Sequence, residues 1–218
     1  MRCLDTIART FLTACTLVCA IASAQAAAPQ RVWDFRVFLD DSPIGYHRFT
    51  LRADGTAREM TSEARFDVKV LVFSAYRYAH DATERWSGDC LTGLNARTDD
   101  DGKRLAVDAV REGDRLTVAS GTAREVLDGC VMSFAYWNPR ILRQSRLLNA
   151  QTGEYEAVNV AAIGAESAMV RGTPVAARRF RITGRKFPID VWYSATDEWL
   201  ALESVLEGGR RLRYQIEK

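Results

Sequence analysis

The stretch Ile189–Ile216, IDVWYSATDEWLALESVLEGGRRLRYQI, decides the fold class. Two short turns, Thr-Asp-Glu at 196–198 and Gly-Gly at 208–209, separate three runs rich in Val, Leu, Tyr and Trp. Runs of this composition between polar turns are typical of β-strands joined in hairpins. The stretch therefore predicts a three-stranded antiparallel meander over Ile189–Ser194, Trp199–Leu206 and Arg211–Ile216.

The same pattern fills the N-terminal half of the chain. Short runs rich in Val, Phe, Tyr and Thr follow one another from Arg31 to Ser120, with turns such as the Asp-Gly pair at 54–55 between them. Asp-Gly supplies the positive φ that a two-residue hairpin requires. Because strand follows strand without long helical patterns between them, we expect a mainly β fold with an antiparallel sheet rather than βαβ units.

The run FDVKVLVFSAYRYAH at 66–80 alternates most clearly. Apart from Ser74, every second residue from Phe66 to Tyr78 is apolar or aromatic, and the residues between them include Asp67, Lys69 and Arg77. An alternation of period two places one set on one face of a strand. We therefore predict that a core or cavity face carries Phe66, Val68, Val70, Val72, Tyr76 and Tyr78.

One segment departs from the strand pattern. Asn138 followed by Pro139 is typical of a helix N-cap with proline in the first turn, which predicts a short helix over Arg140–Leu148. The strand pattern returns after Gly153, with a long strand predicted over Glu154–Ile163. We expect one or two short helices in the whole fold.

The first residues have the three parts of a signal peptide. Arg2 and Arg9 precede the apolar stretch Phe11–Ala22, and Ala24 and Ala26 provide the small residues before a cleavage site. A membrane-spanning helix needs about 20 apolar residues, more than this stretch offers. We therefore expect export with cleavage after Ala26, and no stable transmembrane span.

Cleavage of residues 1–26 leaves 27–218 as a single β-rich domain, which we expect in the periplasm. A lipoprotein anchored through Cys15 is the minor alternative, because it would leave an apolar core shorter than the ~7 residues that a signal peptide needs. The exported domain would carry 28 basic and 27 acidic residues. Nucleic-acid binding requires a clustered basic excess, so we predict no nucleic-acid partner. The composition leaves the oligomeric state open.

Three of the five cysteines lie in the signal peptide, which leaves Cys90 and Cys130. In an oxidising compartment such a pair is expected to form a disulfide. The alternative, a nucleophilic cysteine, lacks a neighbouring base in the sequence. We therefore predict a Cys90–Cys130 disulfide.

No catalytic or cofactor motif stands out. The chain has no Gly-x-Ser-x-Gly elbow, no P-loop and no Gly-x-Gly-x-x-Gly after a strand. The acidic turn at 99–102 lacks the ligand spacing of an EF-hand, and His47 and His80 lack the spacing of a zinc site. We assign no catalytic residue, cofactor or metal, and favour a protein that is not an enzyme.

The aromatic run Phe134–Trp137 and four further tryptophans can be read in two ways. Core packing is the ordinary role of large apolar side chains. The alternative is the wall of a pocket beside the short helix, for which we select Val70, Val72, Tyr76, Tyr136, Trp137 and Trp192.

Three separated stretches carry a family resemblance: WDFRVFLDDSPIGYHRF at 33–49, the segment 129–156, and DVWYSATDEWLALESVLEGGRRLRYQ at 190–215. In this order they resemble a family of exported bacterial proteins known as a domain of unknown function. That family is similar, more distantly, to periplasmic lipoprotein carriers with half-open β-barrels. The resemblance implies a single curved sheet or half-open barrel around an apolar cavity, with the short helix as a lid, and it transfers no catalytic residue.

These observations lead to three hypotheses. The first is a periplasmic binding or carrier module that holds a lipid or another apolar small molecule in a concave sheet. The second is an envelope enzyme, hydrolase-like, that uses scattered acids or the histidines. The third is a structural partner in an envelope complex, which would show an exposed apolar patch.

Overall fold

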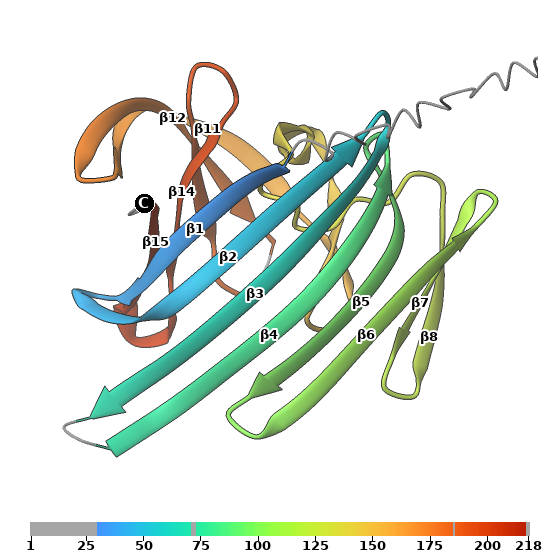
Figure 1. Cartoon of the computed structure of the whole chain (residues 1–218), viewed down its shortest axis with the longest axis horizontal. Coiled ribbons are helices and arrows are strands. Elements are labelled where there is room, and N and C mark those ends of the chain that lie inside the picture. The colour runs from blue at the N-terminus through green and yellow to red at the C-terminus, as the bar shows by residue number, and fades with distance from the viewer. Residues whose placement is uncertain (1–29, 71–72, 185, 217–218) are drawn as a thin grey trace, which may run out of the picture.

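The computed structural model describes residues 30–70, 73–184 and 186–216. The predicted signal peptide at 1–26 lies outside them. Thirteen of the fifteen described strands form one curved sheet, antiparallel between successive neighbours, with the order β11-β12-β13-β14-β15-β1-β2-β3-β4-β5-β6-β7-β8. Figure 1 shows the long strands β1–β6 in front and β11–β15 folded behind them. The predicted fold class, a mainly β chain with a single curved sheet, is confirmed.

The first eight strands form a continuous meander. Their bounds are β1 (Gln30–Leu39), β2 (Ser42–Asp54), β3 (Ala57–Val70), β4 (Phe73–Ser87), β5 (Cys90–Asp100), β6 (Lys103–Glu112), β7 (Arg115–Ser120) and β8 (Ala123–Asp128). In β1 the buried residues alternate, as a sheet with one covered face requires: Trp33, Phe35, Val37 and Leu39.

The C-terminal strands form the other wall. They are β11 (Asn159–Val170), β12 (Thr173–Thr183), β13 (Ile189–Tyr193), β14 (Trp199–Val205) and β15 (Arg211–Ile216), with a short 3-10 helix η2 (Glu207–Gly209) before the last strand. The last strand β15 pairs with the first strand β1, in a register that places Val37 opposite Tyr214. This pairing joins both ends of the described chain in the middle of the sheet.

Residues 129–158, which we call the inner segment, cross the concave face. They contain the 3-10 helix η1 (Pro139–Arg143) and the two short strands β9 (Arg146–Leu148) and β10 (Tyr155–Ala157). The segment begins at the disulfide between Cys90 and Cys130, whose Cα atoms are 4.9 Å apart. The predicted disulfide is therefore present, and it fixes the segment to the start of β5.

Close contacts hold the inner segment against β5–β8. The Leu91 N–H donates to the Val131 carbonyl at 2.9 Å, and the Ser120 Oγ donates to the Thr152 carbonyl at 2.7 Å. Gly153 lies so near Ser120 that a Cβ atom there would be 2.8 Å from the Ser120 Cβ. Only a glycine fits this approach.

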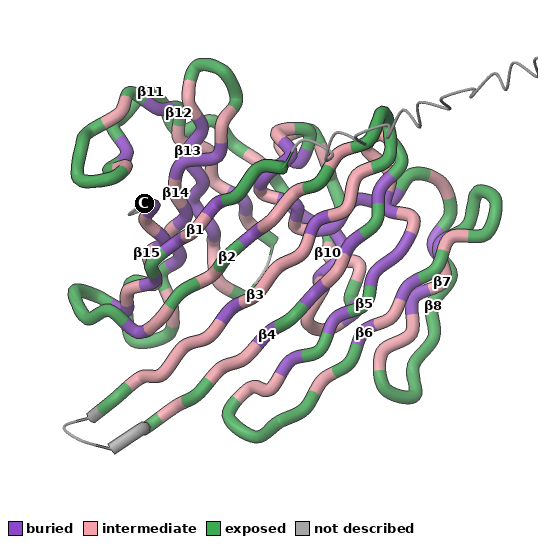
Figure 2. Tube along the Cα trace, viewed as in Figure 1, coloured by how far each residue is buried: buried purple, intermediate pink, exposed green. Residues whose placement is uncertain are grey.

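The inner segment divides the concave face into a filled part and an open part. Its buried apolar side chains join one core with those of β5–β8; they are Val131, Met132, Ala135, Trp137, Ile141, Leu147, Leu148 and Val158. Along β4 the inward side chains change from half-buried at Tyr76 and Tyr78 to buried at His80 and beyond. Figure 2 shows the same change from pink to purple along this strand.

The strands β11–β15 also curl back on themselves. Val170 of β11 pairs with Ile216 of β15, and a second small core of Ala168, Ala177, Trp192 and Leu200 lies between these strands. Trp192 donates from Nε1 to the Glu166 carboxylate at 3.2 Å, and the Arg179 guanidinium lies 5.1 Å above its ring. These contacts make Trp192 part of the second core.

Three local predictions were wrong. The strand expected over Glu154–Ile163 is divided between β10 and β11, with Val158 between them. The helix expected over Arg140–Leu148 is a 3-10 helix over Pro139–Arg143, capped by Asn138, whose Oδ1 accepts from the Arg140 N–H at 3.1 Å. Arg146–Leu148 instead pairs with Tyr155–Ala157, because the backbone there finds strand partners rather than helical ones.

The alternating run at 66–80 was expected to continue through one strand. It is divided between β3, which ends at Val70, and β4, which begins at Phe73. The two strands pair with each other, so the alternating residues meet across the hairpin: Phe66 lies opposite Tyr78 and Val68 opposite Tyr76.

The disulfide gives the first testable prediction. Replacing both Cys90 and Cys130 by Ala should lower the free energy of unfolding by about 4 kcal/mol, because the bond closes a 40-residue loop in the unfolded chain. Urea denaturation followed by tryptophan fluorescence measures this loss, with the reduced wild-type protein as the control. An unchanged midpoint would show that the bond does not constrain the unfolded state.

Candidate functional site

The open part of the concave face contains a cavity of about 700 Å³. Its volume lies within the range of about 300–1,000 Å³ that small-molecule sites occupy. One wall comes from β1–β4 and the other from β13–β15, and the inner segment contributes Tyr136 and Gln151. The cavity is therefore bounded by three parts of the chain that are far apart in the sequence.

Successive side chains of a strand point to opposite faces of the sheet, and most of those that point into the cavity are apolar. The first wall carries Leu39, Ile44, Phe49, Phe66 and Val68. The second wall carries Ile189, Trp199, Leu202, Leu206 and Leu212.

Aromatic contacts stiffen the closed end of the cavity. The Trp199 ring lies 5.5 Å from Tyr136 and 5.0 Å from Phe49, measured between ring centroids. The Tyr193 hydroxyl donates to the Tyr136 carbonyl at 2.7 Å, which fixes this part of the inner segment against β13. The cavity wall is thus held by packing and by hydrogen bonds.

A polar group lies within this apolar wall. His47 of β2 stacks on Phe49 with 4.0 Å between ring centroids. Its Nε2 is 2.7 Å from the Ser62 Oγ, and its Nδ1 is 3.3 Å from the hydroxyl of buried Tyr214. Burial holds the pKa of His47 well below its usual range, and nearby His80 lowers it further. The His47 ring is therefore neutral at neutral pH.

The second histidine, His80, lies two strands away on β4. His47, Ala64, His80 and Thr98 form one row across β2–β5, and the two histidine rings are 6.5 Å apart. The His80 Nδ1 is 2.8 Å from the Thr98 Oγ1, and burial lowers the pKa of His80 to about 4. Both histidines are satisfied strand residues, as expected, but His47 also faces the cavity.

The tyrosines at the open end also have protein partners. The Tyr76 hydroxyl donates to the Asp100 carboxylate at 2.5 Å, and the Tyr78 hydroxyl donates to the Gln151 Oε1 at 3.0 Å. Burial, followed by the bond to Asp100, raises the pKa of Tyr76 well above its usual range. The Tyr76 hydroxyl therefore remains neutral and ties β4 to β5, whereas the Tyr78 hydroxyl ties β4 to the inner segment.

The charged residues at the cavity lie at its rim. Lys186 precedes β13, and its Nζ is 3.2 Å from the Glu207 carboxylate. Arg210 precedes β15, and its Nε is 2.9 Å from the Asp40 carboxylate in the β1–β2 turn. Both basic side chains are about half exposed or more, so the rim is charged and exposed to solvent, whereas the walls are mainly apolar.

The structure brings only some of the predicted pocket residues together. Tyr76 and Tyr136 line the cavity. Trp137 is buried against Trp86, 5.5 Å away between ring centroids, and Trp192 belongs to the second core. The side chain of Val70 and the whole of Val72 lie outside the described residues.

The sequence did not place His47 or the cavity-facing residues of β13–β15 in the pocket. The only signal for that wall was the alternation of inward and outward residues within each strand, which directs Ile189, Leu202 and Leu212 inward. This alternation is the same in a cavity wall and in a filled core. In the described part of the chain, no cluster of three or more His, Cys, Asp or Glu side chains could hold a metal ion. No helix there has the length and hydropathy of a membrane span.

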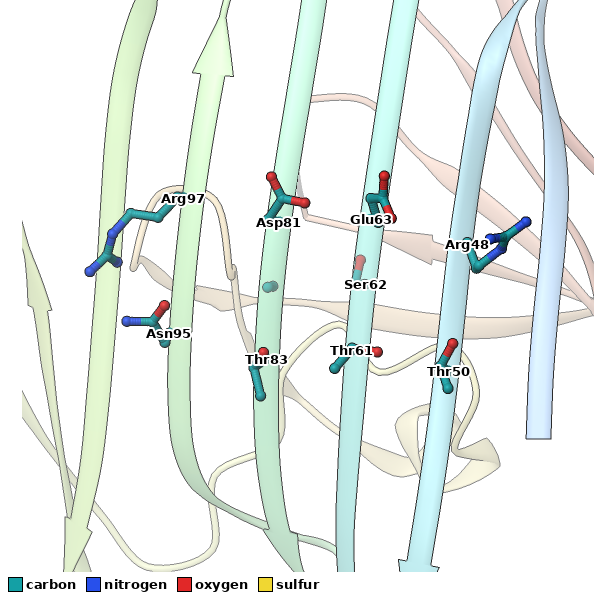
Figure 3. Close-up of a pocket in the computed structure, with 10 residues that line it drawn as sticks. Arg48, Thr50, Thr61, Ser62, Glu63, Asp81, Thr83, Asn95 and Arg97 are labelled. Carbon is teal, nitrogen blue, oxygen red and sulfur yellow. The ribbon is translucent and has the colours of Figure 1, made fainter. Parts of the chain in front are cut away.

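A shallow depression of about 260 Å³ lies on the outer face. Figure 3 shows a row of Thr50, Thr61, Thr83 and Asn95, next to a row of Arg48, Glu63, Asp81 and Arg97. The charged side chains have partners on the same face: Arg48 with Asp34 at 2.7 Å, Asp81 with Arg65 at 2.9 Å and Arg97 with Asp108 at 3.1 Å. This face is an ordinary solvated surface.

Comparisons with known proteins agree with the fold. The family described as "Domain of unknown function (DUF6134)" matches residues 35–217. The crystal structure of a beta-barrel-like protein of domain of unknown function DUF1849 from Brucella abortus is similar, with a TM-score of 0.60 and 11% sequence identity. The similarity covers 87% of this chain and 95% of that one, and it shows the fold alone. No curated protein matches the chain in sequence.

One carboxylate lies deep in the filled part of the concave face. Glu84 of β4 is buried, and its Oε2 accepts from the Trp86 Nε1–H at 3.2 Å. Burial raises the pKa of Glu84 to about 7, although the bond from Trp86 acts in the opposite direction. The folded protein therefore holds a proton on Glu84 at pH values where the unfolded chain releases it.

This proton makes stability depend on pH. Because the folded-state pKa lies above the unfolded one, the stabilisation is complete below about pH 4.5 and is lost as the pH rises through about 7. Glu84→Gln should remove the loss, raising the free energy of unfolding by about 3 kcal/mol at pH 8 and little at pH 4. Urea unfolding at both pH values tests this. Equal effects of the substitution at both pH values would contradict it.

Proposed function

The chain belongs to the DUF6134 family, a domain of unknown function, and we propose that it is a non-enzymatic binding or carrier module for a lipid or another apolar molecule. The cavity on the concave face carries this proposal. It combines a volume suited to a small molecule with two apolar walls and an open, polar rim.

The hydrogen bonding inside the cavity favours an apolar ligand. His47, Tyr76 and Tyr78 already have protein partners, so the wall does not require polar groups from a ligand. Burying a polar ligand atom without a partner costs free energy, whereas burying apolar surface gains about 25 cal/mol per Å². The walls therefore favour a hydrocarbon portion, with any polar end at the Lys186 and Arg210 rim.

We place this function in the periplasm, after cleavage at Ala26. The signal peptide pattern at 1–26 supports export, and the Cys90–Cys130 disulfide is of the kind that persists in oxidising compartments. The lipoprotein alternative at Cys15 would place the same cavity at a membrane surface.

A second candidate function is hydrolysis. The 2.7 Å between the Ser62 Oγ and the His47 Nε2 is a separation typical of a nucleophile and its base. The depressed pKa of His47 makes it a weak base at neutral pH, and Ser62 does not line the described cavity. The binding function is therefore the better supported of the two.

Filling the cavity should abolish binding. Ala75 sits at a bulge in β4, lines the cavity and is exposed, so Ala75→Trp can place an indole at the open end without disturbing the core. We expect the dissociation constant of the fluorescent probe 1-anilinonaphthalene-8-sulfonate to rise at least tenfold. Native mass spectrometry of protein from its own cell envelope should show a bound lipid in the wild type and much less in the variant.

The matched control is Thr83→Trp, which adds the same ring on the outer face of the same strand (Figure 3). It should bind the probe within twofold of the wild type. The proposal fails if the wild type carries no ligand and binds no probe, or if both tryptophan variants bind alike.

A further inference from the structure

The strand β8 is an open edge of the sheet. It pairs with β7 on one side and ends the strand order on the other, and Figure 1 shows it as the outermost strand. Five of its six residues are exposed, and Leu127 alone of the six is buried. Such an edge presents unpaired backbone N–H and C=O groups to any strand that can match it.

The β7–β8 turn determines which residues present these groups. Ser120 pairs with Ala123 across a two-residue turn, so this pair exchanges both backbone hydrogen bonds. Inward-directed groups then alternate along β8, and the Gly129 N–H continues the series by donating to the Asp114 carbonyl at 2.8 Å. The outward-directed groups therefore belong to Arg124, Val126 and Asp128.

We propose that two copies of this chain associate through antiparallel pairing of their β8 edges, with the two-fold axis at Val126. Val126 then pairs with its own counterpart, and Arg124 lies opposite Asp128 of the second copy, twice per dimer. All three outward-directed residues form backbone hydrogen bonds in this register. The proposal is independent of what the cavity binds.

The side chains favour a second copy as the occupant. Arg124, Val126 and Asp128 lie on one face, opposite buried Leu127, so each basic residue meets an acidic one of the partner. The neighbouring register would place Glu125 against itself, and like charges opposite each other are destabilising. The edge is thus self-complementary in one register, as a closed two-fold interface requires.

An apolar row continues this contact across the outer face. Val110, Thr117 and Val126 lie opposite one another on β6, β7 and β8, and Val126 is 52% exposed. Pairing covers Val126 with the same residue of the other copy. Because a six-residue edge buries little area, we expect a weak dimer that is further weakened by salt.

Cysteine cross-linking tests the two-fold axis. In Val126→Cys the two Cα atoms would be about 5.5 Å apart, which a disulfide can bridge. Val110→Cys is the matched control, because Val110 is 59% exposed but its counterpart would be about 24 Å away across five strand spacings. Under mild oxidation we expect covalent dimers of the first variant and not of the second. Equal cross-linking of both variants would overturn the proposal.

Charge reversal tests the register. Sedimentation equilibrium should show a concentration-dependent dimer of the wild-type protein, with a dissociation constant at least tenfold higher for Arg124→Asp. The double variant Arg124→Asp with Asp128→Arg restores opposite charges and should return within threefold of the wild type. A wild-type monomer at all concentrations, or an Arg124→Asp variant that dimerises normally, would overturn the proposal.

Discussion

The attachment of the inner segment to one half of the concave face determines the rest of the structure. The Cys90–Cys130 bond starts the segment at β5, and the close approach of Gly153 to Ser120 holds its far part over β7. A segment fixed in this way fills the face of β5–β8 and the part of β4 beyond His80, and it leaves open the face near Tyr76 and Tyr78. The cavity is therefore the part of the concave face that the inner segment does not fill.

The same boundary separates two chemical environments along one strand. At the open end of β4, Tyr76 and Tyr78 keep their hydroxyls hydrogen-bonded beside the cavity. Farther along the same face, burial lowers the pKa of His80 and raises that of Glu84, so both side chains are held in their neutral forms at mildly acidic pH. The inward face of β4 thus carries an imidazole and a carboxyl group that are both uncharged at mildly acidic pH.

The sequence was most informative where turn residues mark strand ends. The Asp-Gly and Gly-Gly turns predicted the meanders correctly, and the cysteine count predicted the disulfide. The hairpin after Val70 was missed because Leu-Val, with no turn-forming residue, joins β3 to β4. The cavity was only partly predictable, since the strands that carry Leu202 and Leu212 show the same alternation of residues whether these side chains face an open space or a filled core. That difference depends on where the inner segment ends, which local patterns do not contain.

The pairing of β1 with β15 has a consequence for how the protein folds. Asp40 and Arg210, which are 170 residues apart, meet at the cavity rim, and the two walls come from opposite ends of the chain. Closing such long loops must precede the contacts that stabilise them, which slows folding. During synthesis the residues of β1–β8 are complete long before β15, the last neighbour of β1, has been made. Until β15 is available, one edge of β1 is unpaired, and an unpaired strand edge of this kind favours aggregation.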